Sequence, residues 1–137
     1  MIDTTKSNGV EMHLMVVLSN AEPGRDEEFN RWYDEQHVPD TVQKLDSIVS
    51  GRRYRRLDLQ GAPSHPFRYL AVYEIPDDEL DSARQQFVDQ RAERVEALAA
   101  GREPLIPVSD AISPDVLVGF FAPTGTPVVG GSARERR

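Results

Sequence analysis

The sequence has 137 residues, 39% of them hydrophobic, with 16 basic and 23 acidic side chains and a net charge of -7. This length supports one domain with its own hydrophobic core and is short for two. The acidic balance argues against a nucleic-acid partner, which needs a basic surface, and no apolar run is long enough to cross a bilayer. Because the sequence contains no cysteine, disulfides, thiolate metal sites and a cysteine nucleophile are excluded.

The two ends of the chain differ from its middle. The first twelve residues lack the basic and apolar regions of a signal peptide, so we expect a soluble, cytoplasmic protein. Residues 1–10 are predicted to be a flexible N-terminus and residues 11–123 a single domain. Residues 124–137 are predicted to be a disordered tail, because they mix Gly, Pro and Ser without periodicity.

The first half of the domain reads as a strand followed by a helix. Residues 12–19, MHLMVVLS, are short and apolar, which predicts a strand. The acids at residues 26–28 favour a helix N-terminus, and a helix of about four turns is predicted from there. Pro39 is expected to end or kink this helix, with residues 39–45 adding a further turn. The helix carries these residues at helical spacing: Phe29, Trp32, Tyr33, Gln36 and His37.

The second half predicts two strands, a helix and a last strand. Residues 48–57 and residues 67–75 read as strands separated by a loop. Residues 79–100 read as a helix, and residues 115–123 read as the last strand after a loop that proline residues break. The apolar stripe of the second helix is expected to contain Leu80, Ala83, Phe87, Val95 and Leu98.

The order strand, helix, strand, strand, helix, strand predicts an α+β, ferredoxin-like fold. In it a four-stranded antiparallel sheet carries both helices on one face. The first strand is apolar on both sides, with Leu14, Val16 and Leu18 on one and Met15 and Val17 on the other. A half-exposed antiparallel sheet alternates apolar with polar residues, so both faces should be covered. A second copy of the sheet is the simplest cover for the open face, and we expect a homodimer.

Three segments together resemble the EthD-like family of dimeric α+β barrel proteins. They are FNRWYDEQHVPD (residues 29–40), SGRRYRR (residues 50–56) and YLAVYEI (residues 69–75), in the element order given above. The resemblance covers about residues 12 to 122 and implies a pocket between the sheet and its helices. Members of this superfamily include cofactor-free monooxygenases, muconolactone-type isomerases, polyketide cyclases and decarboxylases. The resemblance therefore implies a fold and no single reaction.

His37 is the strongest candidate for catalysis. An imidazole is the side chain most readily poised to take and give a proton near neutral pH. It lies one turn beyond Tyr33, and Asp34 and Asp40 flank it at three residues. Asp40 or a backbone carbonyl is expected to fix its tautomer. The alternative interpretation is that His37 interacts with the dipole at the C-terminus of the helix.

The aromatic residues offer a second group of candidates. Trp32 and Tyr33 are neighbours, so one is expected to line the core or pocket while the other reaches the edge or the dimer seam. If Tyr54 faces the helices, its hydroxyl meets His37 and forms an acid–base pair. The alternative for Tyr54 is a barrel-interior tyrosine with a bridging water.

The strand at residues 50–56 alternates arginines between its two sides. A buried arginine, with Arg52 as the candidate, would hold a carboxylate or an enolate bidentately, while most of these arginines are expected to pair with acids of the first helix. His13, His37 and His65 are far apart in sequence, so neither a metal site nor a cofactor is expected. The substrate-binding candidates are Phe29, Trp32, Tyr33, Arg52, Tyr69, Tyr73 and Phe87.

These residues favour a small cofactor-independent enzyme that binds an apolar, aromatic or polyketide-like carbonyl compound. His37 would act as general acid and base, with Tyr54 and Asp40 as its partners, in an isomerisation, a cyclisation or a decarboxylation. Two alternatives remain open. One is a cofactor-free monooxygenase of the same fold, and the other is a non-catalytic binding protein for a catabolic intermediate.

Overall fold

The computed structural model describes residues 6–7 and 10–131. The strands are β1 (Lys6–Ser7), β2 (Val10–Ser19), β3 (Ser50–Arg55), β4 (Tyr69–Pro76) and β5 (Leu117–Phe121). The helical elements are α1 (Asp26–Trp32), the π-helical turn η1 (Tyr33–His37), α2 (Val38–Lys44), the 3₁₀ turn η2 (Asp77–Glu79) and α3 (Leu80–Ala99).

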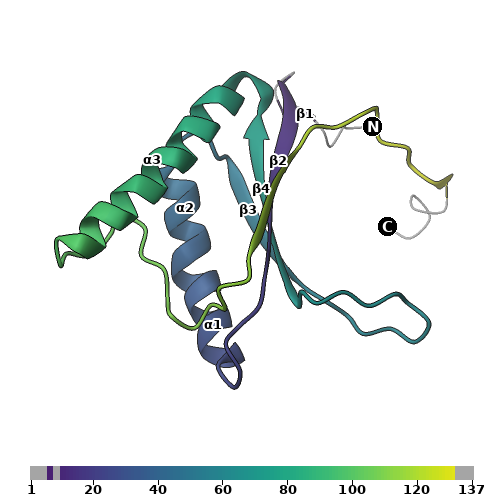
Figure 1. Cartoon of the computed structure of the whole chain (residues 1–137). Helices are drawn as coiled ribbons and strands as arrows, with labels where there is room; N and C mark the ends of the chain where they lie inside the picture. The colour runs from purple at the N-terminus through teal and green to yellow at the C-terminus, as the bar shows by residue number, and fades with distance from the viewer. Residues whose placement is uncertain (1–5, 8–9, 132–137) are drawn as a thin grey trace.

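The strands form an antiparallel sheet in the order β5–β2–β4–β3, with β1 paired to the first residues of β2. Figure 1 shows α1, α2 and α3 together on one side of this sheet. The sheet order and the one-sided helices confirm the predicted α+β, ferredoxin-like fold.

The two ends of the chain are described only in part. Residues 6, 7 and 10, inside the predicted flexible N-terminus, form backbone ladders in β1 and β2. Residues 1–5 and 8–9 lie outside the described residues. In the predicted tail, residues 124–130 form neither helix nor strand, and residues 132–137 lie outside the described residues. The flexibility of both ends stays a prediction.

The register of the sheet decides which residues face the helices. β4 alternates strictly, with Tyr69, Ala71, Tyr73 and Ile75 buried. Residues directly opposite each other on neighbouring strands share a face. The β2 residues opposite this buried row are therefore His13, Met15, Val17 and Ser19. The other face carries Leu14, Val16, Leu18, Leu70 and Val72.

The first helix does not end at Pro39, contrary to one of the two outcomes expected there. It passes through the π-helical turn and runs on as α2 to Lys44. In the turn, the backbone N–H of Val38 bonds to the carbonyl of Tyr33, five residues back. A proline inside a regular helix clashes with the carbonyl four residues earlier and lacks an N–H. The wider π turn directly before Pro39 accommodates both effects.

The buried stripe of α3 is more polar than predicted. Val95 is 71% exposed and Leu98 is 64% exposed, so neither belongs to the stripe. Helical spacing from Ala83 instead leads through Phe87, a glutamine and an arginine to the fully buried Ala97. The side chains of α3 that face the sheet therefore follow each other at intervals of three or four residues, whether they are apolar or polar. The turn-by-turn series is Ala83, Phe87, Gln90, Arg94 and Ala97.

Candidate functional site

A cavity of about 520 Å³ lies between the sheet and the helices. Its sheet wall comes from β2, β4 and β5 and is apolar apart from the hydroxyl of Tyr73. Its helix wall contains the residues with polar or aromatic groups. The sheet wall contains Met15, Val17, Tyr73 and Val118, and the helix wall contains Trp32, Tyr33, His37, Thr41, Phe87, Gln90, Arg91 and Arg94. The loop before β5 closes one side with Ile106, Val108, Ile112, Ser113 and Pro114.

The π turn brings both neighbouring aromatics to this cavity. The ring of Trp32 stacks on the imidazole of His37, with centroids 4.6 Å apart and planes at 30°. The ring of Tyr33 meets the same imidazole edge to face, with centroids 5.0 Å apart. The expectation that the two aromatics point to different faces was therefore wrong. It assumed regular helical geometry, and the wider turn places both beside His37.

His37 lies in the middle of a continuous helical segment, so the alternative role at a helix C-terminus is also wrong. Burial, and after it the positive charge of Arg94, lower the pKa of its imidazole to about 4. The backbone carbonyl of Pro107 and the charge of Asp40 act in the opposite direction. At neutral pH the ring is uncharged. Among the described residues, its Nδ1 atom is buried without a hydrogen-bond partner.

Asp40 acts on His37 through charge alone. Its carboxylate lies 3.7 Å from the ammonium group of Lys44, and no hydrogen bond between Asp40 and His37 occurs in the described part of the chain. Of the two expected partners of His37, the backbone carbonyl, from Pro107, is the one that interacts with the ring. The hydroxyl of Thr41 donates to the backbone carbonyl of His37 at 2.7 Å and ties the two turns together.

Two buried tyrosines add hydroxyl groups to the cavity wall. Tyr33 and Tyr73 are each 2% exposed. Burial raises the pKa of both phenols, and their hydroxyls interact with each other. Thr41 provides a further hydrogen-bonding hydroxyl beside Tyr73. Both phenols therefore remain protonated at neutral pH and are able to donate a hydrogen bond.

Tyr54 and Arg52 lie on the opposite face of the sheet from His37. In the β3–β4 register, Tyr54 is opposite Leu70 and Arg52 is opposite Val72, and neither of those β4 residues faces the helices. Tyr54 is 46% exposed and Arg52 packs over its ring. The predicted pairing of Tyr54 with His37 was wrong, as was the choice of Arg52 as the buried arginine.

Arg53 and Arg55 lie on the face of this strand that is turned toward the helices, and Arg53 is the less exposed of the two. Its side chain is 10% exposed and its guanidinium lies 4.3 Å from the ring centre of Tyr33. The rings of Phe29 and Tyr69 are 5.2 Å and 5.3 Å away, and Nη1 donates to Asp34 at 3.1 Å. Arg53 thus bridges the sheet and the first helix, behind Tyr33 rather than in the cavity wall.

The remaining candidates divide between the cavity and the core. Phe87 lines the cavity, with its ring against Phe120 at 6.0 Å between centroids. Phe29 is fully buried in the core and does not line the cavity. The hydroxyl of Tyr69 donates to Asp26 at 2.7 Å, which fixes β4 to the start of α1. Both were predicted to bind substrate, and both instead support the helix that carries His37.

Sequence reasoning missed the polar wall on α3. Gln90, Arg91 and Arg94 line the cavity, and the signal that points to them is their spacing of three, four and seven residues from Phe87. Their side chains are polar, so a search for an apolar stripe passes over them. The helix wall of the cavity consequently carries two positive charges that were not predicted.

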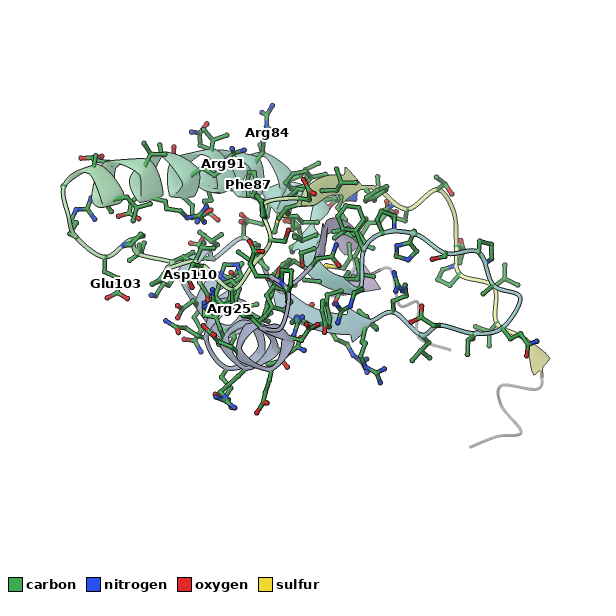
Figure 2. All side chains as sticks on the ribbon, turned by 60° about the horizontal axis from the view of Figure 1, so that its bottom comes forward. Arg25, Arg84, Phe87, Arg91, Glu103 and Asp110 are labelled. Atoms are coloured by element: carbon green, nitrogen blue, oxygen red, sulfur yellow. The ribbon has the colours of Figure 1, made fainter. Side chains whose placement is uncertain are left out.

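The loop before β5 is fastened to the first helix. The guanidinium of Arg25 donates to Asp110 at 2.7 Å and to Glu28 at 2.6 Å. Figure 2 shows Arg25 and Asp110 close together, below α3 with Phe87 and Arg91 on it. This contact holds the loop that closes the cavity.

Comparisons with known proteins find similar solved structures but no matching sequence family. No protein-family model matches the sequence, and no curated protein matches it. Similar solved structures include an EthD family protein from Bacillus halodurans. Its identity is 20%, over 53% of this chain and 70% of that chain, with a TM-score of 0.42.

Two further similar structures are ferredoxin-like. A DABB family protein with a ferredoxin-like fold from Mesorhizobium loti is 13% identical, over 83% of this chain and 98% of that chain, with a TM-score of 0.48. A dimeric ferredoxin-like protein of unknown function from Thermobifida fusca is 13% identical, over 89% of this chain and 99% of that chain, with a TM-score of 0.47. One of the three similar structures is thus an EthD family protein, the family that the sequence resembles.

The described residues lack two further features. None of the helices there is long and apolar enough to cross a membrane. No group of three or more histidine and acidic side chains gathers within that same part of the chain in a way that could hold a metal ion.

Proposed function

We propose that the protein is a small cofactor-independent enzyme that binds an apolar aromatic or polyketide-like carbonyl compound and transfers a proton with His37. Isomerisation, cyclisation and decarboxylation all use such a transfer. The observation that carries the proposal is a buried, uncharged imidazole in the wall of a cavity whose other walls are mostly apolar. A perturbed pKa in a cavity is typical of a catalytic group.

A neutral imidazole accepts a proton from the carbon next to a carbonyl and returns it elsewhere on the product. A pKa of about 4 makes His37 a weak base at pH 7. Negative charge that develops on the substrate beside the ring raises this pKa during the reaction, because an opposite charge favours the imidazolium. Stacking on Trp32 fixes the plane of the ring at the cavity wall.

Tyr33 and Tyr73, rather than Tyr54 or Arg52, are the candidates to stabilise an enolate oxygen. Their protonated hydroxyls lie in the wall that also contains His37. Hydrogen-bond donors placed beforehand at a developing enolate oxygen are a large source of rate enhancement. We assign proton transfer to His37 and stabilisation of the enolate oxygen to the tyrosine hydroxyls.

The proposal includes a homodimer built on the sheet face that carries no helices. On that face Leu117 is 57% exposed and Phe121 is 58% exposed. The neighbouring Leu14, Val16 and Leu18 of β2 extend the same apolar surface. A contiguous apolar surface of this kind is typical of an interface, and a second sheet is its natural complement.

The test of proton transfer does not require the natural substrate. 2-Tetralone is a bicyclic aromatic ketone with acidic protons next to its carbonyl, and their exchange in D₂O is followed by proton NMR. The wild-type protein is expected to accelerate exchange above the buffer rate. His37→Gln should lower that acceleration about 10²-fold, the loss expected when a general base is removed.

The matched control is His65→Gln. His65 lies in the exposed loop between β3 and β4 and does not line the cavity, so this variant should exchange at the wild-type rate. Melting curves of both variants show whether the fold is kept. Wild-type exchange by His37→Gln would remove His37 from the mechanism. Absence of any acceleration by the wild type favours the binding-protein alternative, and an oxygenated product formed only under air favours the monooxygenase.

A further inference from the structure

The cavity has a charge opposite to that of the protein as a whole. The chain carries 23 acidic and 16 basic side chains, yet the cavity wall contains two arginines and no aspartate or glutamate among the described residues. Arg91 and Arg94 both come from α3, one turn apart. In so acidic a protein, a cavity with cations and no acids indicates a site for an anion.

Arg94 has no acidic partner within residues 6–7 and 10–131, although it is only partly exposed. Its Nε atom is buried and has no hydrogen-bond partner there. The acid next to it in sequence, Glu93, is engaged elsewhere, since it accepts from Arg102 at 2.7 Å and from the backbone N–H of Leu105 at 2.8 Å. A buried guanidinium donor without an acceptor is costly unless a ligand supplies one.

Arg91 differs from Arg94 in its surroundings. Its guanidinium lies 5.9 Å from the ring centre of Phe87, at the exposed side of the cavity. The two guanidiniums repel each other, and this repulsion contributes to a lowered pKa for Arg94 after the effect of burial. An anion between them would relieve the repulsion and satisfy the unpartnered Nε atom.

We propose that the ligand of this cavity carries a carboxylate, which Arg94 binds with Arg91 beside it. The inference rests on the proposed function, because it names the substrate class of the same site. The rest of the ligand lies against Trp32 and Phe87, so the cavity selects an aromatic or cyclic carboxylic acid. Gln90 lies on α3 between Phe87 and Arg94, where its side-chain amide is placed to donate a further hydrogen bond to the ligand.

The carboxylate also affects His37. Arg94 lowers the pKa of His37 by its positive charge. A bound carboxylate offsets that charge, so the imidazole becomes a stronger base when the substrate is present. Arg94 therefore binds the substrate, and a carboxylate bound to it raises the pKa of His37.

Trp32 provides the assay, because it is the sole tryptophan of the chain and lines the cavity. The probes are 3-phenylpropanoate and its amide, which have the same shape and differ in charge. Quenching of Trp32 fluorescence, excited where neither probe absorbs, gives both affinities. We expect the wild type to bind the carboxylate about 10-fold or more tightly than the amide, as a charge-assisted hydrogen bond predicts.

Arg94→Gln should remove this preference by weakening carboxylate binding about 10-fold while amide binding stays within about twofold. Arg84→Gln is the matched control, because Arg84 is 75% exposed and points away from the body of the molecule (Figure 2). It should bind both probes as the wild type does. If Arg94→Gln does not fold, wild-type titrations at about 20 and about 300 mM salt provide the same test, since screening weakens carboxylate binding alone.

Three results would overturn the inference: equal affinities of the wild type for the two probes, an unchanged preference in Arg94→Gln, or quenching by neither probe. The proposed function fails by a different result. A cavity that prefers the carboxylate in a protein that does not exchange the protons of 2-tetralone supports the carboxylate site and not the proton transfer.

Discussion

On one side of the sheet, Met15, Val17 and Tyr73 meet three helices and enclose a cavity with one histidine and two arginines. On the other side, Leu117 and Phe121 lie exposed on a surface with no comparable cavity among the described residues. Both faces are apolar, yet only one combines apolar walls with buried polar groups. Apolar side chains line both faces, whereas two cavity residues, His37 and Arg94, each have a buried nitrogen without a hydrogen-bond partner among the described residues.

The largest effect of a single substitution is expected on the exposed face of the sheet. Leu117→Asp places a charge within the apolar surface of the proposed dimer interface, opposite Leu18 in the sheet. We expect the wild type to be dimeric at micromolar concentration and the variant to dissociate at least about 10²-fold more readily. Light scattering measures the masses, and circular dichroism confirms the fold. A wild-type monomer, or a variant that remains dimeric, would contradict the proposed assembly.

Arg52 and Arg53 are neighbours in β3, and their side chains lie on opposite faces of the sheet. Substituting each in turn compares how much the two faces contribute to stability. Arg53 is buried among three aromatic rings and bound to Asp34, whereas Arg52 is exposed. Arg53→Met should lower the free energy of unfolding by about 2–3 kcal/mol, through lost cation–π contacts and the ion pair. Arg52→Met should change it by about 0.5 kcal/mol or less. Urea denaturation of both variants measures this difference, and equal effects would mean that the assigned register of β3 is wrong.

The sequence predicted the order of the elements and the ferredoxin-like sheet because alternation and helical spacing are local properties. The face on which a β3 residue lies is not local. It depends on the pairing of β3 with β4, and a shift by one residue would exchange Arg52 and Arg53. For this reason the choice of Tyr54 and Arg52 failed although the strand itself was correctly predicted.

The site was predicted where it depends on one segment and missed where it depends on packing. His37, Trp32 and Tyr33 were chosen from a single helix, and all three line the cavity. The π turn that joins them could not be read from residue types, although Pro39 indicated a disturbance there. Arg94 was missed because apolar residues were preferred over residues at regular spacing from Phe87.

The lowered pKa of His37 also couples the site to stability. Its folded value of about 4 lies below the ordinary value of 6.5, so the unfolded chain binds a proton first as the pH falls. The contribution of neutral His37 to the free energy of unfolding is fully present above pH 6.5 and is lost as the pH falls from 6.5 to about 4. The full loss is about 3 kcal/mol for a shift of this size. His37→Gln should show a smaller loss of stability over this interval than the wild type.

The most direct test of the account is an NMR titration of the histidine rings, of which the chain has three. His37→Gln assigns the resonance of His37 by its disappearance. This ring is expected to stay neutral through the physiological range and to titrate near pH 4 in the folded protein. A carboxylate in the cavity should move this pKa upward. Titration of His37 near its ordinary pKa of 6.5 would contradict the buried, uncharged imidazole on which the proposed proton transfer rests.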